Sequence, residues 1–171
     1  PERHTCPLKA RPRARGGAKV GTTGPAGGGA SGPKWTALGP LHAGRWMFTP
    51  GADTDRLAWG IALAKKTRKD AGLDPDAIAF GAYVNLGCHT DMGVARSLVR
   101  GGLTTFARFS VMHGKANGPV SAKDADVHQT VRNNYAMNKH TPGDFRQSGP
   151  HTDHFVDRLA IVGPPDRTTY T

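Results

Sequence analysis

The chain has 171 residues, a formal net charge of +10 and a hydrophobic content of 37%. These values suit one domain of moderate size with charged extensions. Two cysteines exclude a disulfide-rich fold. No uncharged run reaches the roughly eighteen apolar residues of a membrane-spanning helix, so no transmembrane segment is predicted.

The positive charge is concentrated at the start of the chain, because residues 1–50 carry eight basic side chains and one acidic one. Residues 7–33 are largely Gly, Pro, Ala and Thr, a composition that buries too little apolar surface to offset the entropy of ordering. We therefore expect a basic Gly/Pro-rich arm and a connecting loop over 1–50, a compact core over 51–139 and an extended tail over 140–171.

The clearest predicted helix spans residues 55–71, with Asp53 or Thr54 as its cap and Gly72 at its end. Its predicted core-facing stripe consists of Leu57, Ala58, Ile61, Ala62 and Ala64.

The next segment gives conflicting signals. Residues 78–86 alternate apolar and small side chains as a strand does, whereas Asp74-Pro75-Asp76 has the form of a helix start. The cap favours a helix here.

Three further elements are predicted downstream. Thr90-Asp91 caps a short helix that ends near Arg100, before two glycines, and residues 103–112 have the β-favouring composition of a strand. Ser121 and Asp124 form a capping box for a helix over about 122–138. The predicted fold class is therefore mostly α, a small helical core with perhaps one short strand or hairpin, flanked by a long N-terminal arm and a C-terminal tail.

The basic side chains indicate a polyanionic partner. In an extended arm, charges two residues apart can face successive phosphates, and the cationic end of the first helix could enlarge the same surface or be a solvated helix end favoured by the helix dipole. The predicted nucleic-acid-binding residues are Lys9, Arg11, Arg13, Arg15, Lys19, Lys34, Lys65, Lys66, Arg68 and Lys69.

Two other groups of residues carry weaker chemical signals. Cys88 and His89 next to Asp91 resemble a nucleophile with its base, but neighbours in sequence seldom face each other, so a semi-buried cysteine at a helix boundary is expected. His151, Asp153 and His154 have zinc-ligand residue types, which His140 could complete. Without paired cysteines we expect loop histidines, no metal and no cofactor.

From these features we expect a non-catalytic structural subunit of a large ribonucleoprotein assembly, a mitochondrial or other organellar ribosomal protein that binds rRNA or another polyanion and contacts neighbouring protein subunits. Two alternatives stay open. One is an accessory subunit of a respiratory or ATP-synthase complex, or a microtubule-associated protein in the cytoplasm or cytoskeleton. The other is a small enzyme that uses Cys88, His89 and distant histidines.

Overall fold

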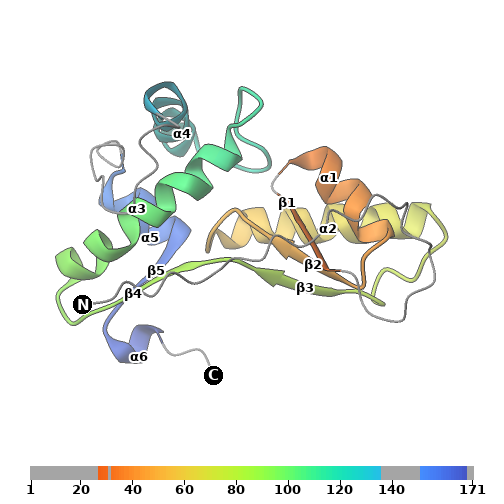
Figure 1. Cartoon of the computed structure of the whole chain (residues 1–171), viewed down its shortest axis with the longest axis horizontal. Helices are drawn as coiled ribbons and strands as arrows, with labels where there is room; N and C mark the ends of the chain where they lie inside the picture. The colour runs from red at the N-terminus through yellow and green to blue at the C-terminus, as the bar shows by residue number, and fades with distance from the viewer. Residues whose placement is uncertain (1–26, 31, 136–150, 169–171) are drawn as a thin grey trace, which may run out of the picture.

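The computed structural model describes residues 27–30, 32–135 and 151–168, which contain both helices and short strands (Figure 1). The described elements are β1 (Gly27–Ala30), α1 (Pro33–Leu38), the 3-10 turn η1 (Gly39–Leu41), β2 (Arg45–Phe48), α2 (Thr54–Asp70), β3 (Ala79–Ala82), β4 (Asn85–Cys88), α3 (Met92–Ser110), α4 (Ala122–Asn134), α5 (Asp153–Leu159), β5 (Ala160–Gly163) and α6 (Pro165–Thr168).

All described strand pairs are parallel. One sheet has the order β1-β2-β3 and the other pairs β4 with β5. In Figure 1, β3 and β4 form successive parts of one extended segment, with α1 and α2 beside β1–β3, α3 and α5 beside β4 and β5, and α4 against α3. The backbone N–H of Ala52, after β2, donates to the carbonyl of Leu159 at 2.8 Å, which joins the two halves. Parallel strands linked through helices make this an α/β fold.

The expectation of a mostly α fold with one short strand is therefore wrong. Asp74 does not start a helix: its carboxylate accepts a hydrogen bond from the N–H of Asp76 at 2.9 Å, closing a local turn. The alternating residues that follow form β3 and β4. Pairing with β2 and β5, which a single segment cannot reveal, decides between helix and strand.

The predicted strand over 103–112 is also wrong, because α3 continues through Gly101 and Gly102 to Ser110. These glycines do not end the helix. A Cβ at Gly102 would overlap the Asn85 side chain, and one at Gly87 would overlap the backbone oxygen of Ala95. Both glycines therefore allow α3 to lie directly on β4.

Several helix starts are confirmed. Asp53 caps α2, Asp91 caps α3, and Ser121 caps α4, in each case by accepting a backbone N–H three residues later. The predicted α2 stripe is partly right: Ala64 is buried, and Leu57 and Ile61 pack against buried residues. Ala58 and Ala62 are exposed instead, and the other buried positions of α2 are Arg56, Gly60 and Arg68.

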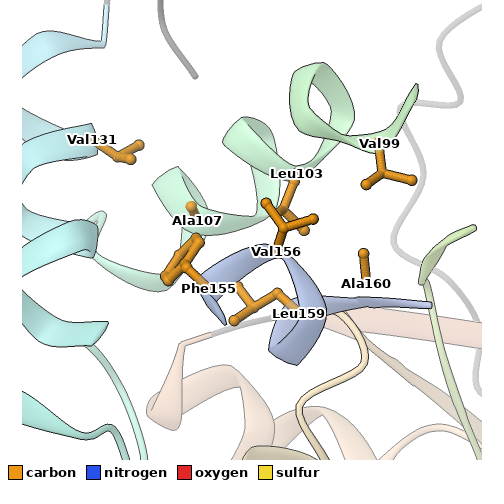
Figure 2. Close-up of a cluster of buried hydrophobic side chains, with 8 residues drawn as sticks. All are labelled: Val99, Leu103, Ala107, Val131, Phe155, Val156, Leu159 and Ala160. Atoms are coloured by element: carbon orange, nitrogen blue, oxygen red, sulfur yellow. The ribbon is translucent and has the colours of Figure 1, made fainter. Parts of the chain in front are cut away.

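Two hydrophobic clusters hold the fold together. The smaller consists of Trp46, Phe48 and Ile78 beneath α2. The larger, in Figure 2, joins α3, α4, α5 and the start of β5; its members are Val99, Leu103, Ala107, Val131, Phe155, Val156, Leu159 and Ala160. The tail predicted to be loop from residue 139 onward thus contributes α5 and β5 to the main core.

Candidate functional site

The carboxyl ends of β4 and β5 lie side by side, since the N–H of His89 donates to the carbonyl of Gly163 at 2.9 Å. In sheets of parallel strands connected by helices, ligands bind beyond the carboxyl ends of the strands. The residues that follow β4 at this edge are His89, Thr90 and Asp91, all exposed. This edge is therefore the candidate site.

Asp91 fixes the geometry of the edge. Its Oδ1 accepts the N–H of Val94 at 3.0 Å, which caps α3. This hydrogen bond, followed by one from Gly93, lowers the pKa of the Asp91 carboxyl, with a smaller contribution from His89. Asp91 is thus an anion that already occupies the N-terminus of α3.

His89 is oriented by the same turn. Its Nδ1 accepts a hydrogen bond from the backbone N–H of Asp91 at 2.9 Å. The same Nδ1 lies 3.3 Å from the carbonyl oxygen of Asp91, to which it donates in the tautomer that carries the proton on Nδ1. Both contacts hold the imidazole ring against the turn at an exposed position.

Cys88 is exposed, and it shares one face of β4 with Leu86, because alternate residues of a strand point to the same side. The exposed Val84 directly precedes this strand. Gly87 lies on the opposite face, against α3. The expectation of a semi-buried cysteine at a helix boundary is therefore corrected: Cys88 ends a strand, next to an uncovered apolar strip.

A second polar group lies where three helices meet, and in it the half-buried Arg158 on α5 contacts three carboxylates. Its distances to carboxylate oxygens are 3.1 Å for Asp53, 3.0 Å for Asp55 and 3.5 Å for Asp124. The hydrogen bond that Arg158 donates to Asp53 is the main cause that raises the pKa of Arg158. We call this set the Arg158 network. It ties the start of α2 to α4 and α5. Sequence analysis missed it because Asp53 and Asp124 were each assigned to a local cap.

Among the described residues, the C-terminal histidines are not brought together with Asp153 as metal ligands. The buried rings of His128 and His151 flank Phe155, at 5.0 and 5.3 Å between ring centroids. Asp153 instead binds Arg96 and Arg100. His140 lies outside the described residues, and among those described no group of three ligand-type side chains could hold a metal.

Burial is the main cause of the low pKa of both histidines, which is about 4 in each case. The positive charge of Arg56 lowers the pKa of His128 further, and Arg100 acts likewise on His151. Both rings are therefore neutral core side chains at neutral pH.

The predicted phosphate-binding residues are distributed differently. Lys9, Arg11, Arg13, Arg15 and Lys19 lie outside the described residues. Lys34 and Lys69 are exposed.

The other three make contacts within the fold. Lys65 binds Asp76 and Lys66 binds Asp70, each at 2.5 Å. Arg68 is buried and donates to three backbone carbonyls. Their binding to nucleic acid stays a prediction, although Arg68 is not at the surface.

Comparison with protein families gives a match to the luciferase-like monooxygenase model over residues 3–169. The chain belongs to the luciferase-like monooxygenase family. Its match extends over nearly the whole chain, including the basic segment that sequence analysis interpreted as an RNA-binding arm. A comparison with curated proteins gives no match.

Membership of the luciferase-like monooxygenase family overturns the functional expectation. The family is enzymatic, and its reaction type is that of an oxidoreductase. A non-catalytic ribosomal, rRNA-binding subunit is therefore wrong, as is the statement that the chain is not an enzyme. The predicted organellar location and partners stay predictions. None of the helices in the described ranges is long and apolar enough to cross a membrane.

Proposed function

We propose that this chain catalyses oxygenation of an organic substrate at the carboxyl ends of β4 and β5. The observation that carries the proposal is the family match across residues 3–169. It is supported by the exposed Cys88-His89-Thr90-Asp91 turn at the edge where parallel α/β folds bind ligands.

Monooxygenation places one atom of O₂ in the substrate and releases the other as water, with two electrons and two protons consumed. Side chains of this edge do not supply that electron pair, so a reduced organic cofactor such as a flavin would do so. The uncovered strip of Val84, Leu86 and Cys88 fits the flat apolar ring of such a group. The N-terminus of α3 does not suit an anionic group of such a cofactor, because the Asp91 carboxylate already accepts a backbone N–H there.

His89 is the residue to which we assign proton transfer. With Nδ1 held against the backbone of Asp91, Nε2 is the ring nitrogen that can exchange a proton with an oxygen of the substrate. The Asp91 turn holds the ring in one orientation, and the exposed position lets the proton be exchanged with water.

The test is oxygen uptake by the full chain with chemically reduced flavin mononucleotide and aldehyde as probes, together with fluorescence titration of oxidised flavin. We expect saturable flavin binding and aldehyde-dependent uptake. His89→Ala should lower turnover by about 10²-fold without weakening flavin binding, whereas His113→Ala, beyond the far end of α3, should leave both unchanged. Absence of both binding and uptake in the unmodified chain would refute the proposed function; equal turnover in H89A would refute the role of His89 alone.

A further inference from the structure

Helix α5 and strand β5 form one continuous piece of the chain. The helix ends at Leu159 and the strand begins at Ala160, with no residue between them; we call residues 153–163 the α5–β5 segment. Its strand pairs in parallel with β4, and its last residue, Gly163, accepts the backbone N–H of His89 at the candidate site. Movement of α5 away from the core would therefore also move the edge that carries His89.

The α5–β5 segment is anchored by an aromatic ring that lies between two histidines. Phe155 is fully buried, and its ring centroid lies 5.0 Å from that of His128 on α4 and 5.3 Å from that of His151, just before α5. Both ring nitrogens of His151 are buried without a hydrogen-bond partner. Such a site accommodates a neutral ring at some cost, and a charged ring at a much greater cost.

The charges near His151 add to this cost. After burial, the positive charge of Arg100 on α3 and the neighbouring ring of His128 lower the pKa of His151. The guanidinium of Arg100 donates to the backbone carbonyl of His151 and pairs with the carboxylate of Asp153. A proton on His151 would therefore place a second cation beside Arg100.

The surroundings of His128 act in the same direction. Burial, and after it the positive charge of Arg56 on α2, lowers the pKa of His128. The carbonyl of Ala107 on α3, 3.3 Å from Nδ1, and the carboxylates of Asp124 and Asp53 offset this only in part. Both carboxylates already neutralise cations in the Arg158 network.

The other half of the fold has no comparable group. Trp46, Phe48 and Ile78 form the smaller cluster, and the described side chains that pack against it are all apolar. Among the described residues, His128 and His151 are the only buried histidines. Acid therefore acts first on the packing of α5 against α3 and α4.

We propose that acid releases the α5–β5 segment from the core while the β1–β3 and α2 half stays folded. Once Phe155 leaves, water reaches both rings, so the released form takes up protons that the packed form excludes. Release also removes the strand that pairs with β4 and the carbonyl that holds His89. The proposal does not depend on the proposed function; if that function holds, acid would open the site through this segment.

The test is amide hydrogen exchange of the full chain at pH 7 and pH 5, corrected for the intrinsic effect of pH on exchange. With a pKa of about 4 when packed and 6.5 when free, each ring should raise the fraction of the released form about 20-fold between these values, and both rings about 400-fold. Amides of the α5–β5 segment should lose protection by this factor. At pH 5 they should exchange faster than the slowest amides of α2 (Thr54–Asp70), because release requires only part of the fold to open.

His151→Phe removes one titrating ring, so it should reduce the change with pH to about 20-fold. His154→Phe, the same substitution at an exposed position of α5, should leave the full change. Equal protection of the slowest amides in α5–β5 and α2 at pH 5 would show that the chain unfolds as a whole and would overturn the proposal, as would an H151F variant with an unaltered pH dependence. The comparison of the two segments uses the unmodified chain, so it decides the question even if H151F does not fold.

Discussion

Replacing Arg158 by methionine should destabilise the fold strongly. Methionine keeps much of the aliphatic stem of arginine but removes the cation that Asp53, Asp55 and Asp124 share. Asp53 and Asp124 are 5% and 3% exposed as side chains, so water cannot replace the lost partner, and one oxygen of Asp124 is already buried without a hydrogen bond.

The magnitude follows from burial. Removing one partner of a buried ion pair costs about 3–5 kcal/mol. The lower end applies here, because Arg158 is 27% exposed and Asp55 is 71% exposed, which gives a loss of about 3 kcal/mol in the free energy of unfolding. For a domain of this size, that loss lowers Tm by about 6–12 °C.

Urea denaturation of the full chain measures this loss, with Arg132→Met on the exposed side of α4 as the matched control. The control should change stability by no more than about 0.5 kcal/mol. Combining Arg158→Met with Asp53→Asn should recover part of the loss, since asparagine still caps α2 but carries no charge. The argument that buried carboxylates cause the loss would be refuted if R158M had the same free energy of unfolding as the unmodified chain. It would also be refuted if the double variant were no more stable than R158M.

The buried histidines predict that the fold is sensitive to acid. The pKa of His128 and of His151 is about 4 in the folded chain and 6.5 when unperturbed, so the unfolded chain binds more protons between these values. The free energy of unfolding is therefore highest above pH 6.5 and decreases from pH 6.5 towards pH 4, by up to about 3 kcal/mol for each ring. Urea titrations at pH 7 and pH 4.5 measure the fall, which should be smaller in His151→Phe; equal stability at both values would contradict neutral burial. Gly87→Ala should cost about 1–3 kcal/mol, because its Cβ would overlap the backbone of Ala95. Gly101→Ala should instead stabilise α3 by about 0.5–1 kcal/mol, since the added methyl group enters open space; thermal melts of both variants check the contrast.

Helix starts could be predicted from the sequence because a cap is a local interaction. Asp53, Asp91 and Ser121 each bond to a backbone N–H three residues away, and such contacts form within one turn of chain. Local signals failed where a partner distant in sequence decides the outcome. The alternation over 78–86 was visible, but β2 and β5, which pair with it, lie up to 75 residues away in register.

The site was partly visible as well. The side-chain chemistry of Cys88, His89 and Asp91 suggested a catalytic group, but neighbours in sequence seldom face each other, so the sequence favoured a structural role. The structure shows that these residues lie at the carboxyl end of a parallel strand, where α/β folds bind ligands. The Arg158 network left no signal, because it joins Asp53 to a residue 105 positions away.

The excess of positive charge gave the least reliable indication of function. Net charge governs solubility and long-range attraction, not fold or chemistry. A Gly/Pro-rich composition shows only that a segment has few apolar side chains of its own to bury. The family match begins at residue 3, and Gly27–Ala30 at the end of the basic segment forms strand β1 beside Arg45–Phe48. A glycine-rich run can therefore join a sheet once a neighbouring strand supplies the hydrogen bonds and the apolar cover. Trp46 is that cover here: a Cβ at Gly28 would overlap its indole ring, so the absence of a side chain is what lets β1 lie against the core.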